Sequence, residues 1–485
     1  MNDRIEAHVW RVCAVVILGS MMSILDTTIV NVALDTLGRE LHSPISEIQW
    51  VVTGYMLALA AVIPVSGWAA RRFGAKQVYL ISLVLFTAGS ALCGLATSST
   101  ELVVFRVLQG VGGGMIMPVV QLMMAEAAGP KRMGRVMSVV AAPMMLAPIL
   151  GPALGGLILD NASWRWIFYI NVPVGVIAFV LALRLLPKVE RQPANPLDLT
   201  GLALMSLGLP LLTYGLAEIG ITGSFTATKV LLPGIAGIAL IGVFVWHALR
   251  VRFPLLDIRL YRRPTFSSAS AAMFCLAAAL FGGMILLPLY WQQIRHMSVV
   301  DTGLLTAPQG LGAALAMPIA GRLTDRYGGG LLALIGVSLV GIATIPFGLI
   351  GAHTSILWLS VAMVVRGVGI GFGFMPAMTA AFAALDRSEL ADATPQLNTL
   401  QRVGGSIGTA ILAVVLQRAS VGVHSISGAA AAFGTAFWAS AVLTFAGVGP
   451  AVILMITERR ARARLAAEPG GPGLDAQAQP EAVPV

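Results

Sequence analysis

Apolar stretches of about 20 residues recur from one end of the chain to the other, and they leave no segment long enough for a water-soluble domain. Of the 485 residues, 57% are hydrophobic and only 11% are charged, and the mean hydropathy is +0.86. A chain so poor in charge cannot surround a core with a surface that faces water. The sequence therefore predicts an all-α membrane protein.

Charged residues and clusters of Pro and Gly divide these stretches into fourteen predicted membrane helices. The first stretch follows Arg4 and Arg11 but has no convincing cleavage site, so we interpret it as a retained helix and not a signal peptide. The predicted helices span residues 11–34, 48–70, 77–97, 101–126, 136–159, 166–186, 199–219, 228–249, 266–290, 302–321, 331–351, 355–384, 395–417 and 430–456.

Lys and Arg residues are distributed unequally between the two sides of the membrane. An even number of helices places both termini on one side, and that side receives most of the 31 basic residues. The loops of the other side hold only Arg39, Arg165, Lys229, Arg295 and Arg418. Because basic loops stay in the cytoplasm, both termini are predicted to be cytoplasmic. The same bias explains the pI near 9.9, so nucleic-acid binding is not needed to account for the basic residues.

Two segments of the chain repeat after about 255 residues, which indicates internal symmetry. Residues 67–76 are echoed by residues 321–330, and Arg106 with its following glycines is echoed by Arg366. Six helices occupy about 180 residues, so two further helices fit between the repeats. We expect a six-helix bundle at residues 1–187, two inserted helices and a cytoplasmic linker at 188–264, a second six-helix bundle at 265–456, and a disordered cytoplasmic tail at 457–485.

Five short motifs carry a family resemblance: Leu25–Leu34, Trp50–Tyr55, Phe105–Gly114, Gly151–Gly156 and Trp164–Pro173. Together they resemble the major facilitator superfamily, specifically its fourteen-helix drug:proton antiporter branch, from about Leu25 to Ala410. The resemblance implies two six-helix bundles with two inserted helices in a bacterial cell (inner) membrane. It also implies a monomer that exports amphipathic drugs or toxic metabolites in exchange for protons. Such a protein is not an enzyme, and it uses the proton gradient with no cofactor.

The resemblance also assigns residues to conformational change, and this chain departs from the family pattern at two positions. Arg71 stands where the family usually has an aspartate, and Asp35 stands where it usually has a proline. The residues expected to form the conformational motifs are Gly67, Arg72, Gly74, Gly151, Pro152, Gly155, Gly156, Gly321, Asp325 and Arg326.

Asp26 and Arg106 are the strongest candidates for proton coupling. A carboxylate in a membrane helix costs roughly 2.5–3.5 kcal/mol on insertion scales and is usually protonated or paired. Asp26 and Arg106 fall at similar depth in their predicted helices, so the two can face one cavity. Protonation of the acid would break the pairing and change which helix packing is favoured. A purely structural ion pair is the alternative. Asp35 is either a second proton site or a solvated acid.

Candidates for substrate contact are weaker. Asn31, Tyr55, Gln109, Phe374 and Asn398 are the side chains expected to line a cavity, although amides in membranes more often join helices to each other, as Asn171 and Gln401 also could. Arg366 and Arg402 lie inside predicted helices, and structural roles are favoured for both.

Other functions find little support in the sequence. Residues 404–408 match the pattern of a serine nucleophile, but all six histidines fall in tails, loops or helix ends. None of the four lysines follows a glycine, so there is no Walker A loop for an ATP-driven pump. The three cysteines are far apart in apolar runs and indicate neither a disulfide nor a metal site. Transport of a lipid or a single metabolite in either direction, and a non-transporting receptor, remain alternatives.

Overall fold

The computed structural model describes residues 6–129, 132–187 and 195–467, and this part of the chain is helical with short connections. Thirteen helices among these residues are long and apolar enough to cross a membrane. A fourteenth crossing is made by two shorter helices in series, α6 (Met133–Met144) and α7 (Ala147–Asn161). Fourteen crossings agree with the number predicted from the apolar stretches.

The amino-terminal half begins and ends at the same end of the bundle. Its remaining elements are α1 (Ala7–Glu40), α2 (Ile45–Val62), η1 (Ile63–Val65), α3 (Ser66–Phe73), α4 (Ala75–Leu95), α5 (Ser99–Ala128), α8 (Trp166–Tyr169) and α9 (Asn171–Leu185). Helices α2, η1 and α3 form one continuous crossing, from Ser46 to Phe73.

Two inserted helices and a short 3-10 turn precede the carboxy-terminal half. They are α10 (Leu199–Thr222), α11 (Thr228–Arg250) and η2 (Ile258–Arg262). The carboxy-terminal half then consists of α12 (Pro264–Gln293), α13 (Val299–Tyr327), α14 (Gly329–Gly348), α15 (Ile356–Ala383), α16 (Leu390–Ser420), α17 (Ile426–Ala446) and α18 (Val448–Ala467).

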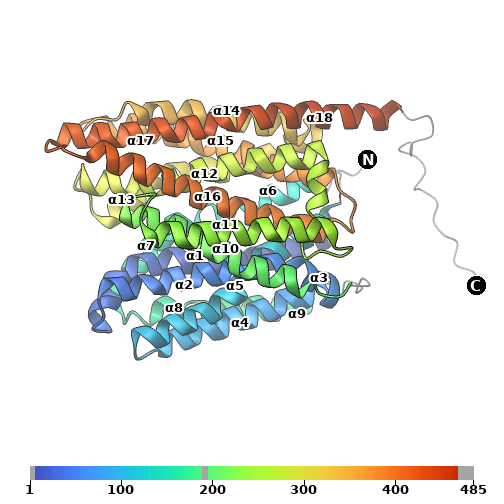
Figure 1. Ribbon diagram of the computed structural model, residues 1–485, viewed down its shortest axis with the longest axis horizontal. Helices are drawn as coiled ribbons and strands as arrows, with labels where there is room; N and C mark the ends of the chain where they lie inside the picture. The colour runs from blue at the N-terminus through green and yellow to red at the C-terminus, as the bar shows by residue number, and fades with distance from the viewer. Residues whose placement is uncertain (1–5, 130–131, 188–194, 468–485) are drawn as a thin grey trace, which may run out of the picture.

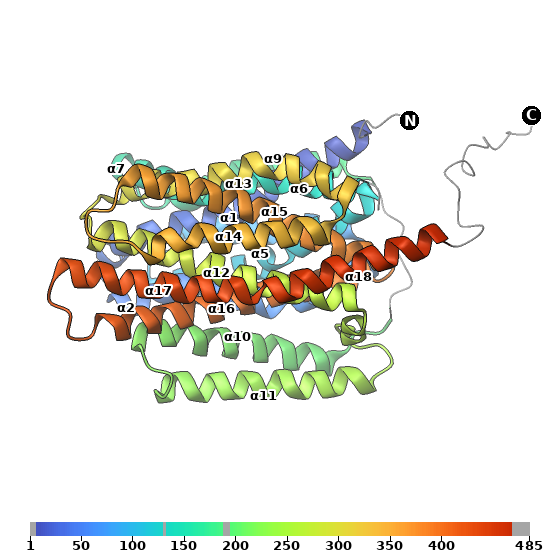
Figure 2. The same ribbon diagram turned by 90° about the horizontal axis from the view of Figure 1, so that it is seen from above.

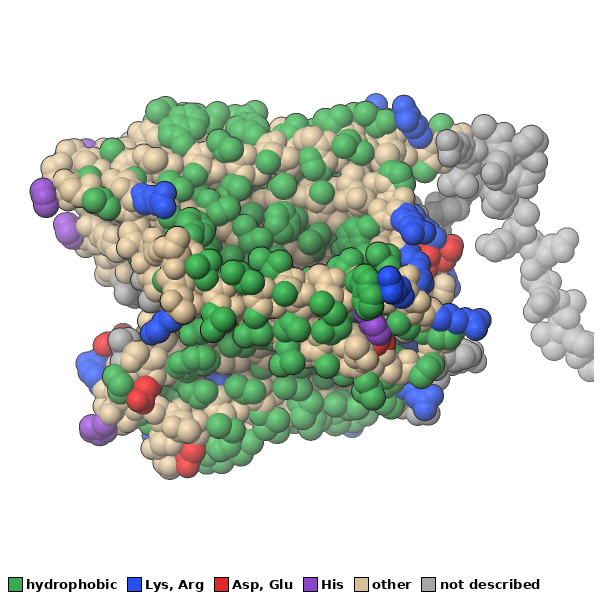
Figure 3. Space-filling view, viewed as in Figure 1, with side chains coloured by type: hydrophobic (Ala, Val, Ile, Leu, Met, Phe, Trp, Pro, Cys, Tyr) green, Lys and Arg blue, Asp and Glu red, His purple; other side chains and the backbone are tan. Residues whose placement is uncertain are grey.

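The two halves lie side by side with their helices roughly parallel, and the inserted pair lies outside them (Figures 1 and 2). Helix α10 packs against both α2 and α16, so the inserted pair covers the seam where the two halves meet. The start of α1 and the end of α18 lie at the same end of the bundle, which we call the termini end. Figure 3 shows the face seen in Figure 1. An apolar belt surrounds its middle, and many of its Lys and Arg side chains lie at the termini end.

The internal repeat predicted from the sequence is visible in the packing. Helix α5, which carries Arg106, packs between α2 and α4, and helix α15, which carries Arg366, packs between α13 and α14. The turns at Gly74 and Gly328 are also equivalent, because both glycines have positive φ angles, 89° and 99°. Only glycine adopts such angles without strain.

Several helix boundaries differ from the prediction, and three of these differences bear on the fold. The crossing expected at 136–159 is broken at Met145–Leu146, because Pro148 has no N–H to donate to the carbonyl of Met144. Helix α1 continues to Glu40, where Asp35 and Arg39 form an i,i+4 ion pair.

The third difference concerns the start of the tail. We predicted disorder from residue 457, but α18 continues to Ala467. Its buried Glu458 accepts hydrogen bonds from the N–H groups of Gly329 and Gly330 and so holds α18 against the start of α14. Residues 468–485, which complete the predicted tail, lie outside the described residues.

Candidate functional site

The carboxylate of Asp26 lies at the centre of the amino-terminal half, fully buried, with hydrogen-bond donors on both of its oxygens. Oδ2 accepts from Nη1 of Arg106 at 2.6 Å, and Oδ1 accepts from Nε2 of Gln109 and Nδ2 of Asn171, both at 2.9 Å. Asp26, Arg106 and Gln109 are 0% exposed and Asn171 is 3% exposed. A buried charge is tolerated when it is paired and hydrogen-bonded, and this carboxylate meets both conditions.

The guanidinium of Arg106 is held from several sides. Its Nε donates to the carbonyl of Val51 at 3.1 Å, and its Nη1 also donates to Oε1 of Gln109 at 2.8 Å. The ring of Tyr55 lies 4.0 Å from the guanidinium carbon, a cation–π distance. These contacts fix the position of the one cation that offsets Asp26.

The local sequence of α5 explains why the site forms here. Arg106 and Gln109 are three residues apart, so they lie on the same face of the helix. Gly110 packs against the backbone of Tyr55, and Gly112 packs against the backbone of α4. A side chain at either glycine would collide with backbone atoms, so small residues let three helices approach closely around the charges.

Helix α4 also contributes to this site, through Ser90, a residue that the sequence did not single out. Ser90 of α4 is fully buried, accepts from Nδ2 of Asn171 at 3.1 Å and donates to the carbonyl of Phe168 at 2.9 Å. Ser90 thus orients the amide of Asn171 toward Asp26. The only sequence signal was a serine inside an apolar run, which is too common to indicate a site.

Several predicted site residues lie elsewhere. Asp35 is at the exposed end of α1 with Arg39, 2.8 Å away, and it takes no part in the Asp26 network. Asn31 is exposed. Phe374 is half-buried in α15 and packs with the apolar core. Asn398 donates to Oε1 of Gln121 at 2.6 Å and so joins α16 to α5. Tyr55 and Gln109 are the substrate candidates that lie at the Asp26 site.

The two halves are joined by polar contacts near the termini end. Arg71 of α3 forms an ion pair of 2.5 Å with Asp392 of α16. The carboxylate of Asp325 accepts hydrogen bonds from the backbone N–H groups of Gly134 and Arg135, at 2.9 and 3.3 Å, at the start of α6. An anionic side chain is favourable at a helix amino terminus. Arg71, which departs from the family pattern, therefore makes an inter-half ion pair of its own.

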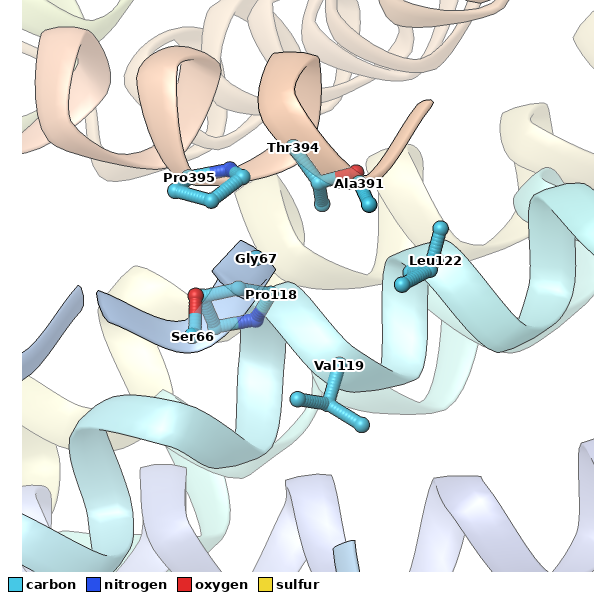
Figure 4. Close-up of a pocket in the computed structure, with 8 residues that line it drawn as sticks. All are labelled: Ser66, Gly67, Pro118, Val119, Leu122, Ala391, Thr394 and Pro395. Atoms are coloured by element: carbon cyan, nitrogen blue, oxygen red, sulfur yellow. The ribbon is translucent and has the colours of Figure 1, made fainter. Parts of the chain in front are cut away.

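Close packing seals the same region. Gly67 lies so near the carbonyl oxygen of Ala391 that a Cβ on this glycine would collide with it. Figure 4 shows the crevice between η1–α3, α5 and α16 at this point, where Ser66 and Pro118 face Pro395. The crevice is too narrow to admit a water molecule. The described conformation is therefore closed between the halves near the termini end.

The remaining motif residues have varied surroundings. Gly151 packs against Thr28 of α1, Gly155 against Ile29, and Gly321 against the backbone of α6, whereas a Cβ on Gly156 would meet no atom within 4 Å. Pro152 lies inside α7, past the break in this crossing. Arg72 and Arg326 are exposed.

A chain with two equivalent helical halves, a buried acid–arginine pair in one of them and a seam that closes at one end has the architecture of a secondary membrane transporter. The family model for the Major Facilitator Superfamily matches residues 16–409. The chain belongs to this superfamily.

Comparisons with individual proteins agree with this assignment. The chain is 42% identical over 417 residues to the "Multidrug resistance protein B homolog" of Mycobacterium tuberculosis (strain ATCC 25618 / H37Rv), covering 85% of this chain and 77% of that one. It is 32% identical over 398 residues to the "Multidrug export protein EmrB" of Haemophilus influenzae (81% and 78% covered). The crystal structure of the human organic anion transporter MFSD10 (TETRAN) has a similar fold, with a TM-score of 0.64 at 14% identity, covering 93% of this chain and all of that one.

Proposed function

We propose that this protein exports small amphipathic molecules, such as drugs or toxic metabolites, from the bacterial cytoplasm or inner leaflet while protons enter. The observation that carries the proposal is the buried carboxylate of Asp26, which Arg106, Gln109 and Asn171 hold between them. Relatives named for multidrug resistance and export support the choice of substrate.

Protonation of Asp26 supplies the coupling. An ionised Asp26 pairs with Arg106, which in turn is bound to α2 through the carbonyl of Val51 and the ring of Tyr55. A proton on Asp26 cancels the charge that holds Arg106, so the packing of α1, α2 and α5 that this charge favours loses its advantage. A proton can bias the equilibrium between two conformations only through such a difference in interaction energy.

The orientation follows from the basic residues. We assign the termini end to the cytoplasm, because positively charged loops are retained there. The contacts at Gly67, Arg71 and Asp325 then close the cytoplasmic side, and the described conformation is closed to the cytoplasm. The chain acts as a monomer in the lipid bilayer and needs no cofactor besides the proton gradient.

Replacement of Asp26 tests the proposal. Asp26→Asn keeps the shape of the side chain but cannot exchange a proton at this position, so efflux driven by a pH gradient should fall to the background of empty vesicles. The measurement is proton movement in inverted membrane vesicles on addition of an exported dye. Asp35→Asn is the matched control, because Asp35 is exposed and its partner is Arg39; we expect normal coupling. Coupled export by Asp26→Asn at the wild-type rate would contradict the proposal.

A further inference from the structure

In the middle of the carboxy-terminal half, Arg366 and Arg402 carry positive charges that pair with no carboxylate of the described residues. Arg366 is fully buried, and its hydrogen bonds go to neutral oxygens, Oε1 of Gln309 at 3.0 Å and the carbonyl of Ala279 at 3.1 Å. Arg402 of α16 is half-buried and forms no hydrogen bond or ion pair within the described ranges. Arginines inside a membrane bundle normally pair with acids or carbonyls or line a substrate path.

Arg402 lies on the face of α16 that meets the other half. Ala391 and Pro395 on this face approach Gly67, and Asn398 bonds to Gln121 of α5. Position 402 follows 398 by four residues and 395 by seven, which places it on the same stripe of the helix. At 1.5 Å per residue, Arg402 lies about 18 Å from the start of α16, near the middle of the membrane.

The group that Arg402 approaches belongs to the proton site. Arg402 interacts electrostatically with Tyr55, whose ring lies 4.0 Å from the guanidinium carbon of Arg106 and whose hydroxyl lies 3.4 Å from that of Ser23. Arg106 is already neutralised by Asp26, whereas Arg402 is not. The seam between the halves therefore presents one uncompensated cation beside the Asp26 network.

On this basis we infer that Arg402 is the residue that binds the anionic group of the substrate, and that the transported molecules include amphipathic organic acids. The inference rests on the proposed function and adds a substrate class to it. An anionic group at Arg402 replaces the carboxylate that this arginine lacks, and a charge-assisted hydrogen bond is among the stronger polar contacts. A cation at the same place meets an uncompensated like charge in a poorly screened interior.

Arg402 and Asp26 are separate groups, one on each half. An anion bound at Arg402 and a proton bound at Asp26 do not compete for one atom. The direction of proton movement can therefore be measured independently of whether the protein prefers anionic or cationic substrates. For a one-for-one exchange, outward movement of a monovalent anion and inward movement of a proton both carry positive charge inward. An inside-negative membrane potential therefore accelerates export of an organic anion.

Binding of two dyes of opposite charge tests the inference. Fluorescein and rhodamine 123 share a xanthene ring system, and at neutral pH the first is an anion and the second a cation. With the full-length purified protein, fluorescence anisotropy should show that Arg402→Gln binds fluorescein at least about tenfold more weakly than wild type, the loss of one charged hydrogen bond. Binding of rhodamine 123 should be unchanged or tighter.

Two further variants control for damage to the fold. Arg402→Lys keeps the charge and should retain preference for fluorescein over rhodamine 123. Arg418→Gln makes the same chemical change at the exposed end of α16 and should bind both dyes as wild type does. Equal fluorescein affinity of wild type and Arg402→Gln, or no preference between the dyes in wild type and Arg402→Lys, overturns the inference.

The binding measurement needs no proton gradient, so its result is separate from that of the transport assay. If fluorescein binds through Arg402 but moves in the same direction as protons, the proposed antiport is wrong and the assignment of Arg402 stands. If Asp26→Asn loses coupled export while Arg402→Gln binds fluorescein normally, the proposed function stands and the assignment fails.

Discussion

At the scale of single residues, the site is a buried ion pair with two extra donors. A buried salt bridge of this kind requires both partners, because removing either one leaves an uncompensated charge in a low-dielectric interior. Gln109 and Asn171 add donors to Asp26 without adding charge. These two amides satisfy the carboxylate oxygen that Arg106 does not reach, and they hold Asp26 against α5 and α9.

Asn171→Ala should therefore weaken coupled transport. The carboxylate loses one of its three donors, and a buried oxygen left without a donor costs roughly 1–3 kcal/mol, so efflux driven by a pH gradient should fall several-fold. The measurement is the initial rate of dye efflux in vesicles at a fixed pH gradient. Asn161→Ala is the control, because Asn161 bonds to the carbonyl of Leu157 on its own helix. An unchanged efflux rate would show that Asn171 does not act on Asp26.

At the scale of elements, glycines decide how closely the helices of the two halves approach. Gly67 sits at the junction of α3 with α16, where there is no space for a Cβ. Gly156, in α7, has space around it. Both belong to motifs predicted from the sequence, but only the first is packed tightly in the described conformation.

Gly67→Ala should therefore open the termini end. The added methyl collides with the carbonyl oxygen of Ala391, so the closed conformation is disfavoured relative to one in which the halves separate here. A cysteine introduced at Thr394, which lines the crevice, should react faster with a water-soluble maleimide in the Gly67→Ala background. Gly156→Ala should leave the labelling rate as in wild type. Equal labelling in all three backgrounds would refute the collision argument.

At the scale of the whole molecule, Arg71 and Asp392 join the two halves across the seam. The pair is only partly exposed, with side-chain exposures of 16% and 20%, so solvent screens it less than a surface ion pair. Separation of the halves at this end would break the pair, so its energy contributes to the balance between conformations and not only to the stability of either half.

An exchange of charges tests this contribution. Arg71→Glu places two acids together, so the closed conformation is disfavoured and dye export should fall several-fold, with faster maleimide labelling at the crevice. Adding Asp392→Arg restores opposite charges and should recover most of the export. Failure of the double variant to improve on the single one would mean that Arg71 acts through another partner.

The sequence by itself determined the number of crossings, the repeat and the pairing of Asp26 with Arg106. These follow from local properties: the length of an apolar run, the position of a charge within it, and the cost of leaving that charge unpaired in a membrane. The break before Pro148 was not predicted, although its cause is local.

Only the tertiary structure decided which side chains share a site. Asn171 reaches both Asp26 and Ser90 because α9 packs against both α1 and α4, and Asp392 reaches Arg71 across the seam between the halves. Successive side chains on a helix are 100° apart, so a modest rotation of the whole helix changes which side chains face a given neighbour. Which face meets which neighbour depends on contacts between segments remote in the chain, and no single segment specifies them.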